Sequence, residues 1–296
     1  MKDLGRLITA MVTPFAEDGS VDYEQAQRLA LALLDSGSDG VVIVGTTGES
    51  PTLVRDEELK LFAAVKSAVG NRGSVIAGTG SNSTAEAISA TKQAEKTGVD
   101  ACLLVVPYYN KPSQEGLYQH FKAVAGATRL PCIVYNVPSR TVVNLSAETT
   151  IRLSRVDNIV GTKEASANLA AIAQIINETD DDFTVWSGND ADTLPIMALG
   201  GYGVISVVSH LVGRQIKDML DFFAAGQTKE AARIHRHLMP LFDSCFVVSN
   251  PVPLKYLLNH IGFAVGEPRP PLLPPDEKTT AFLQEALKGY RIDLPL

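Results

Sequence analysis

The sequence is poor in cysteine and lacks any cysteine pattern that would predict a disulfide framework. Its 296 residues include three cysteines, Cys102, Cys132 and Cys245, and no Cys-x-x-Cys pair. Cys102 and Cys132 lie inside apolar runs, which is typical of buried thiols. Disulfides form and persist in oxidising compartments, so free buried thiols favour a reducing one. We therefore expect a cytoplasmic protein.

Runs of lysine and arginine are also missing, and the formal net charge is -7. A protein that binds nucleic acid or an anionic membrane surface through charge carries a basic patch. The composition therefore argues against both as main partners. If the substrates are small anions, a few placed basic side chains and backbone N–H groups must supply the positive charge that receives them.

Long apolar runs are missing as well, since none approaches the roughly 18 residues that a membrane span needs. The first residues, MKDLGRLITAMVTPF, lack the basic region, apolar stretch and small-residue cleavage site of a signal peptide, and they predict the first strand of the protein. No membrane partner is expected. At 45% hydrophobic residues, the chain can nevertheless bury a sizeable core.

Short β-rich apolar runs alternate with amphipathic segments through most of the chain. Eight runs with helical segments between them predict a (β/α)8 TIM barrel. The runs are almost continuously hydrophobic, as in parallel strands covered on both faces. A doubly wound sheet is the alternative, but it would normally use fewer strands. The runs are residues 7–15, 40–45, 74–80, 101–109, 132–138, 159–165, 183–190 and 203–210.

The strand pattern stops after about residue 226, where the sequence predicts only helices. Helical segments near 229–249, 253–261 and 276–290 are separated by a proline-rich stretch at 267–275. We therefore expect a barrel that carries the active site over residues 1–225 and a C-terminal helical extension over residues 226–296. Helix starts are marked by Ser113 and Ser146 as N-caps and by a capping box over residues 83–86.

A lysine lies inside the sixth apolar run, Ile-Val-Gly-Thr-Lys-Glu. Lys163 shares a strand face with Gly161, whose small size would leave room beneath it. A buried ammonium is costly unless it is neutralised or paired. Desolvation lowers the pKa of lysine and leaves a fraction of free amine, which imine formation with a carbonyl requires. Taken alone, the residue leaves an equal alternative, in which the lysine extends from the strand end into solvent.

The fifth run ends in a tyrosine and a rigid turn, with the sequence Tyr135-Asn-Val-Pro138-Ser-Arg140-Thr. Active sites of barrels lie at the C-terminal ends of strands. Arg140 is placed there to form a bidentate pair with a carboxylate, and its alternative is an ordinary surface arginine. For Tyr135 the alternative to a catalytic phenol is an amphipathic core residue whose hydroxyl finds a partner.

Other strand ends carry polar or small residues. The turn at residues 45–50, Gly-Thr-Thr-Gly-Glu-Ser, can hold an anion with its backbone N–H groups and hydroxyls. Tyr108 and Tyr109 follow the fourth run, where they suit either a subunit contact or an active-site phenol. Glycines such as Gly188 and Gly203 would let a ligand approach the backbone.

Several cofactor classes find no support in the sequence. The turn at 45–50 lacks the Lys-Ser/Thr of a Walker loop, and residues 78–80 lack the third glycine of a dinucleotide fingerprint. His235 and His237 are two residues apart on a predicted helix, so they do not share a face for a metal. No Gly-x-Ser-x-Gly nucleophile elbow occurs. We expect no metal site and no separate cofactor.

Four motifs, each at a strand end and in the same order, resemble the pyruvate-dependent aldolase/lyase superfamily that includes N-acetylneuraminate lyase. Within it they are similar to the dihydrodipicolinate synthase family. The motifs are residues 45–50, Pro107-Tyr-Tyr109, residues 135–141 and Lys163-Glu164. The likeness extends over essentially the whole chain. It implies a lyase of lysine and diaminopimelate biosynthesis that condenses pyruvate with L-aspartate 4-semialdehyde.

The resemblance also implies a role for each residue of the site. Lys163 forms a covalent imine with pyruvate, and this imine takes the place of a cofactor. The pyruvate carboxylate is received by Thr46 and Thr47. A proton relay consists of Tyr135, Thr46 and Tyr109, with Tyr109 donated by a neighbouring subunit of a homotetramer built from dimers. Arg140 receives the carboxylate of aspartate semialdehyde, and the backbones of Gly188 and Ile205 line the site.

Arg140 distinguishes between relatives. Sialic acid lyases lack an arginine at this place, so its presence favours the synthase. The alternatives are a related pyruvate aldolase or lyase that acts on a sugar acid or a hydroxy-oxo acid, and a non-catalytic paralogue that senses a metabolite.

A second, regulatory site is less clearly marked. In lysine-inhibited relatives an effector site lies near the tight dimer interface, and four residues here match it: Ser50, Asn82, Glu86 and Tyr108. Its usual histidine-type positions are Arg55 and Glu58 in this chain. We therefore expect weak or absent inhibition by L-lysine.

Overall fold

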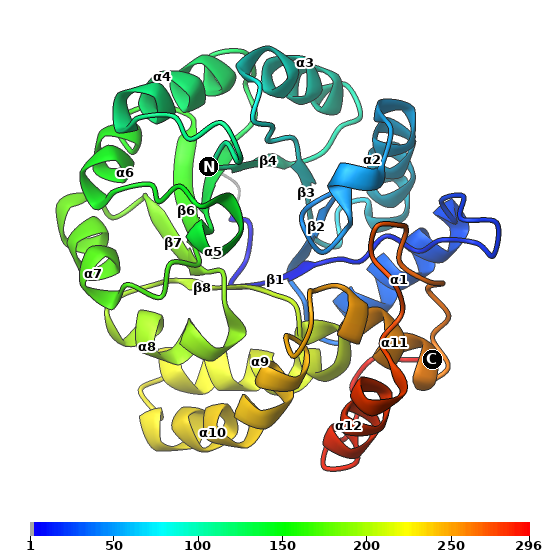
Figure 1. Ribbon diagram of the computed structural model, residues 1–296. Helices are drawn as coiled ribbons and strands as arrows, with labels where there is room; N and C mark the ends of the chain where they lie inside the picture. The colour runs from blue at the N-terminus through cyan, green and yellow to red at the C-terminus, as the bar shows by residue number, and fades with distance from the viewer. Residues whose placement is uncertain (1–2) are drawn as a thin grey trace. The chain divides into compact units, whose positions relative to one another are not determined.

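The computed structural model describes residues 3–296, and its strands follow one another as a closed barrel in the order β1 to β8 (Figure 1). Each strand pairing with a defined register is parallel. The predicted (β/α)8 barrel with C-terminal helices is confirmed. The strands are β1 Leu7–Ala10, β2 Gly40–Ile43, β3 Ser74–Gly78, β4 Ala101–Val105, β5 Cys132–Asn136, β6 Ile159–Glu164, β7 Thr184–Ser187 and β8 Gly203–Ser206.

Helices follow the strands, and several of them begin where the sequence predicts. The side chains of Ser113 and Ser146 accept hydrogen bonds from backbone N–H groups of the first turn, as N-caps do. The helices are α1 Tyr23–Asp35, α2 Arg55–Val69, α3 Thr84–Glu95, α4 Gln114–Ala125, α5 Pro138–Thr141, α6 Ala147–Leu153, α7 Leu169–Glu178, α8 Thr193–Ala198, α9 Ser209–Ala224, α10 Thr228–Ser244, α11 Val252–His260 and α12 Glu277–Leu287, with short 3-10 helices η1 Ser50–Thr52 and η2 Asp190–Asp192.

The capping box predicted at the start of α3 forms only in half. Ser83 accepts a hydrogen bond from the backbone N–H of Glu86 at 3.4 Å. The carboxylate of Glu86 instead accepts from the hydroxyl of Ser81 at 2.9 Å, and the Ser83 N–H donates to that same hydroxyl at 3.1 Å. Ser81 therefore stands between the two partners of the expected box.

The chain divides into two compact units. The first unit combines the chain up to Val75 with Ser206–Leu296, so it includes the C-terminal helices α10, α11 and α12. The second unit is Ile76–Ile205. The predicted boundary between residues 225 and 226 stays a prediction.

The second unit has a continuous apolar core between its strands and helices. Helices α3, α4, α6 and α7 lie outside the strands β4 to β7 (Figure 1), and neighbouring helices contact one another. Fully buried side chains such as Leu104, Phe121 and Val134 fill the space between the two layers. Burying each large apolar side chain contributes roughly 1.5–3 kcal/mol. This rigid layer holds the strand ends that carry Lys163 and Tyr135.

The helices give no sign of a membrane span. Within residues 3–296, none is both long enough and apolar enough to cross a bilayer.

Candidate active site

Lys163 is buried near the C-terminal end of β6, with only 5% of its surface exposed. Parallel pairing sets it beside Tyr135 of β5 and Trp186 of β7. Its Nζ lies 4.2 Å from the centroid of the Tyr135 ring, within the range of a cation–π contact. The lysine therefore does not extend into solvent, and the alternative that the sequence left open is wrong.

The burial of Lys163 makes its amine a better nucleophile at neutral pH. Desolvation is the main cause that lowers the pKa of Lys163 to about 8. The negative charge of Asp190 opposes this shift, and the positive charge of Arg140 adds to it. At pH 7 a lysine with that pKa is roughly one-tenth neutral, whereas an ordinary lysine is neutral in fewer than about one molecule in a thousand. Imine formation needs the neutral form.

Two glycines determine what lies next to the lysine. A Cβ on Gly161 would lie 2.2 Å from the Thr184 carbonyl oxygen and 2.8 Å from the Trp186 ring. The room that the sequence predicts at Gly161 is therefore taken up by β7. A Cβ on Gly188 would lie 3.2 Å from Cε of Lys163 and 2.8 Å from the Ala165 Cβ. The backbone of Gly188 is thus adjacent to the lysine.

The turn after β5 carries Arg140 on the short helix α5. Arg140 is exposed, and its positive charge adds to the lowering of the pKa of Lys163. The turn is fixed from inside by Thr141, whose hydroxyl donates to the carbonyl oxygens of Val137 at 3.1 Å and Val143 at 2.8 Å. An exposed guanidinium on a turn that is fixed in this way is a suitable receptor for an anionic substrate.

Asn136 and Glu164 form a buried polar pair that sequence reasoning missed. Nδ2 of Asn136 donates to both carboxylate oxygens of Glu164, at 3.1 and 3.2 Å, and the backbone N–H of Ser166 donates to the same carboxylate at 2.8 Å. Burial raises the pKa of Glu164. Oδ1 of Asn136 accepts from the N–H of Leu145 at 2.9 Å. The pair connects the strand that carries Tyr135 to the strand that carries Lys163.

Asp190 is a further residue that the sequence did not single out. It begins η2, three positions past the last residue of β7, and is 3% exposed. Its charge raises the pKa of Lys163, so it stabilises a cation at this position. An acidic residue directly after a strand of a predicted barrel is the signal that would have identified it.

Ile205 and the two tyrosines occupy different environments in the second unit. Ile205 is fully buried on β8. Tyr109 is 89% exposed and has a left-handed backbone with φ 73°, while Tyr108 is 39% exposed. The loop is held by Asn82, whose side chain donates to the carbonyl of Tyr108 at 3.2 Å. The role of Tyr109 as a phenol donated to a neighbouring subunit stays a prediction.

Thr46 and Thr47 belong to the first unit, in the turn between β2 and η1. Thr47 is buried, and its hydroxyl accepts a hydrogen bond from Asn250 at 2.8 Å. The carbonyl of Thr46 accepts from the N–H of Glu49 at 3.1 Å, and the Thr13 hydroxyl donates to the Gly48 carbonyl at 2.6 Å. The turn is thus well ordered by its own unit, and its approach to Lys163 stays a prediction.

The effector residues are divided in the same way. Ser50 lies in the first unit, whereas Asn82, Glu86 and Tyr108 lie in the second. At the departing positions, Arg55 forms an ion pair with Glu58, and burial raises the pKa of Glu58 to about 7. Weak or absent inhibition by L-lysine stays a prediction.

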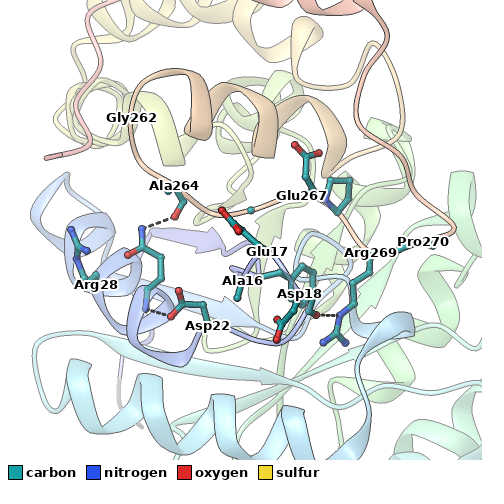
Figure 2. A pocket seen from close by; sticks show the side chains of 15 residues that line it. Ala16, Glu17, Asp18, Asp22, Arg28, Gly262, Ala264, Glu267, Arg269 and Pro270 are labelled. Atoms are coloured by element: carbon teal, nitrogen blue, oxygen red, sulfur yellow. Dashed lines mark hydrogen bonds between the residues drawn. The ribbon is translucent and has the colours of Figure 1, made fainter.

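A cavity of about 630 Å³ in the first unit contains none of the predicted catalytic residues. It lies between the loop after β1 and the C-terminal segment before α12, and Figure 2 shows Asp18, Asp22 and Glu267 at its wall. Among the described residues, His, Cys, Asp and Glu form no group that could hold a metal ion.

Comparisons with known proteins agree over the full length. A model of the Dihydrodipicolinate synthetase family matches residues 3–290. A 4-hydroxy-tetrahydrodipicolinate synthase of Dehalococcoides mccartyi is 69% identical over 296 residues, which is 100% of both chains. One from Moorella thermoacetica is 53% identical over 284 residues, covering 96% of this chain and 97% of that protein.

Solved structures show the same likeness. A dihydrodipicolinate synthase of Bacillus anthracis has a TM-score of 0.96 and 46% identity, covering 98% of this chain and 100% of that one. A synthase of Cyanidioschyzon merolae with lysine bound has a TM-score of 0.95 and 49% identity, covering 97% of this chain and 98% of that one.

The lowered pKa of Lys163 gives a first prediction. The rate at which formaldehyde and cyanoborohydride methylate Lys163 should rise to half its maximum near pH 8, because the amine loses its proton there. Peptide mass spectrometry across the pH range measures this, with the exposed lysines as an internal reference.

Two variants test the direction in which each neighbouring charge shifts the pKa of Lys163. Asp190→Asn should move the half-point to lower pH, since Asp190 holds the proton on, and Arg140→Ala should move it to higher pH. A Lys163 profile that still climbs in parallel with the exposed lysines above pH 10 would contradict the assignment.

Proposed function

This chain belongs to the dihydrodipicolinate synthetase family, and we propose that it works through an imine between Lys163 and pyruvate. It is a lyase that forms 4-hydroxy-tetrahydrodipicolinate from pyruvate and L-aspartate 4-semialdehyde, a step of diaminopimelate and lysine biosynthesis. The observation that carries the proposed mechanism is the buried amine of Lys163, with its pKa lowered to about 8, beside the Tyr135 ring.

The reaction starts with attack of the neutral Lys163 amine on the C2 carbonyl of pyruvate. The carbinolamine loses water and leaves a protonated imine. This cation is buried where Asp190 raises the pKa of the amine, so the same negative charge stabilises the iminium. The attraction between this cation and the carboxylate is stronger in a water-poor site than it would be in solvent.

The next steps build the carbon–carbon bond and release the lysine. Loss of a proton from C3 converts the iminium to an enamine. The enamine carbon attacks the aldehyde carbon of aspartate semialdehyde, and the aldehyde oxygen takes up a proton and becomes the 4-hydroxyl. The amino group of the second substrate then attacks C2, closes the ring and expels the Lys163 amine. One water is released overall.

Proton transfer requires a group close to C3 and to the aldehyde oxygen. We assign this role to Tyr135, because its ring lies against the amine and a phenol beside a cationic imine can give and take a proton. Thr46 and Tyr109 complete the relay, and Thr47 receives the pyruvate carboxylate together with the backbone of its turn. Gly188 and Ile205 contribute backbone to the wall of the site.

Arg140 supports the assignment of the second substrate. It is exposed on the rim formed by α5, and its charge reaches Lys163. Aspartate semialdehyde carries a carboxylate that a guanidinium binds in a bidentate manner. A related aldolase for a sugar acid or a hydroxy-oxo acid is the alternative, and preference for such an aldehyde in a coupled assay would favour it.

The exposed phenol of Tyr109 supports a homotetramer built from dimers, in which each subunit donates this residue to its neighbour. The pyruvate imine serves in place of a separate cofactor, and the cytoplasm is the proposed compartment. Inhibition by L-lysine is proposed to be weak or absent, because Arg55 and Glu58 pair with each other at the departing positions.

Borohydride trapping tests the imine. Incubation with pyruvate and borohydride should add a carboxyethyl group to the peptide that contains Lys163, that is, the mass of pyruvate plus two hydrogens less one water, because borohydride reduces an imine to a stable secondary amine. Lys163→Arg and a sample without pyruvate are the controls. An unmodified Lys163 in a folded protein would instead support a metabolite sensor.

Arg140→Ala tests the second substrate. Loss of a charge-assisted bidentate contact of about 3 kcal/mol should raise the KM for aspartate semialdehyde roughly 100-fold. Pyruvate trapping at Lys163 should survive. Arg152→Ala is the matched control, since Arg152 pairs with Glu115 on the exposed surface, where an ion pair contributes little. Equal kinetics of the two variants would sink the role of Arg140.

Tyr109→Phe tests the shared relay. Turnover should fall about 100-fold, the range of a lost proton-transfer group, while the melting temperature and the subunit count measured by light scattering stay unchanged. Tyr108→Phe, in the same loop, is the control. Wild-type turnover in Tyr109→Phe would refute the role.

A further inference from the structure

The turn that carries Thr46 and Thr47 ends in a residue with a strained backbone. The backbone of Glu49 has a left-handed conformation, with φ 57° and ψ 37°, that residues other than glycine rarely adopt. Its carboxylate is also taken out of water, since the residue is 2% exposed. Such a conformation persists only where the surroundings determine it. The contacts of Glu49 therefore show what holds the turn.

Lys255 of α11 supplies the first contact. Its Nζ lies 2.7 Å from Oε1 of Glu49, and both side chains are 1% exposed. Nζ also donates to the carbonyl of Glu267 at 3.2 Å and lies 3.9 Å from the centroid of the Phe15 ring. Burial lowers the pKa of Lys255 to about 8, and the charge of Glu49 opposes the shift. The carboxylate of Glu49 thus favours the charged form of Lys255, which burial alone would disfavour.

Arg269 supplies the second contact. Its backbone N–H donates to Oε2 of Glu49 at 2.9 Å. Its guanidinium makes a bidentate pair with Glu57 of α2, at 2.6 and 2.8 Å, and donates to the carbonyl of Thr52 at 2.7 Å. Figure 2 shows Arg269 bonded to the loop after β1 at the wall of the cavity, where it donates to the carbonyl of Gly19. The segment that presents this N–H is therefore itself held in place.

Asn250 supplies a third contact with the turn, at Thr47 instead of Glu49. Its Nδ2 donates to the hydroxyl of Thr47 at 2.8 Å, and both residues are buried. Three residues of the C-terminal region, Asn250, Lys255 and Arg269, thus hold one turn of six residues. Asn250 holds the hydroxyl of Thr47, whereas Lys255 and Arg269 hold the carboxylate of Glu49.

A buried ion pair is weak as a stabilising device. The desolvation of two charges offsets much of their attraction, and well-packed apolar side chains often stabilise a protein as well or better. A buried pair does fix geometry, because either charge without its partner is strongly unfavourable. The Lys255–Glu49 pair therefore permits essentially one arrangement of the turn.

We propose that Glu49, Lys255 and Asn250 are positioning residues that hold the Thr46–Thr47 turn in the geometry that receives the pyruvate carboxylate. This inference rests on the proposed function, in which the turn binds that carboxylate. On this view the C-terminal region contributes to catalysis by holding the turn that binds pyruvate. Preorganised donors lose affinity when they are displaced by even about 1 Å.

Kinetics of single variants test the proposal. In Glu49→Gln, Lys255→Met and Asn250→Ala the KM for pyruvate should rise about 10-fold to 100-fold, because the donors of the turn are no longer held. The KM for aspartate semialdehyde should stay within about twofold, a split that a general loss of structure would not produce. Lys255→Arg keeps the charge and should recover part of the pyruvate KM.

Two controls make the outcome decisive. Lys217→Met removes an ion pair of the same unit, with Asp39 at the opposite end of β2, and should leave both KM values unchanged. Asn250→Ala removes one neutral hydrogen bond, so it reports on the turn even if the charge variants fail to fold. Wild-type pyruvate KM in folded Asn250→Ala, or equal rises in both KM values, would overturn the proposal.

Trapping separates this inference from the function on which it rests. If borohydride adds no pyruvate to wild-type Lys163, the proposed mechanism fails. If wild-type protein is trapped and the positioning variants reach half-maximal trapping at the wild-type pyruvate concentration, only the positioning role fails. A higher half-maximal concentration in the variants supports both.

Discussion

The structure of the second unit depends on the energy of keeping a lysine amine away from water. The strand register that buries Lys163 between Tyr135 and Trp186 removes its hydration and so favours the neutral form. The same register positions an aromatic ring against the amine. The negative charge of Asp190 limits the shift, which favours the cationic form that the proposed imine would take. The charge of Asp190 thus offsets only part of the pKa shift that burial causes in Lys163.

The first unit also contains a buried lysine, but there a carboxylate pairs with the amine. Lys255 is also buried, and burial is again the main cause that lowers its pKa to about 8. Its Nζ, however, is 2.7 Å from a carboxylate that is buried with it. A close partner of opposite charge holds the amine in an ion pair, which suits a structural role and leaves no site for a carbonyl. The two lysines show that a lowered pKa does not by itself identify a nucleophile, and that the neighbours decide.

Much of the fold and part of the site could be predicted from the sequence. The eight apolar runs are short and almost continuously hydrophobic, as buried parallel strands are, and polar residues at or just past their ends, Lys163 and Arg140 among them, were recognisable by position. Asp190, at the end of the seventh run, offered the same positional signal, whereas Lys255 offered none. Lys255 lies in a segment with a helical pattern, where a lysine normally faces solvent, and only the tertiary fold brings it to a carboxylate about two hundred positions earlier in the chain. Periodicity reports on the local environment, whereas such a pairing is set by the long-range arrangement of the chain.

Both units use a buried asparagine to hold the backbone beyond a strand end. Asn136 donates to a carboxylate and accepts from a backbone N–H nine residues later, while Asn250 donates to the hydroxyl of Thr47. An amide suits this task because it offers a donor and an acceptor without a net charge, so it is less costly to bury than a carboxylate or an ammonium. Buried polar groups rigidify a structure when they are satisfied. The turn that carries Thr47 is therefore ordered by a neutral amide as well as by the buried Lys255–Glu49 pair, and the amide fixes the threonine hydroxyl without adding a further buried charge.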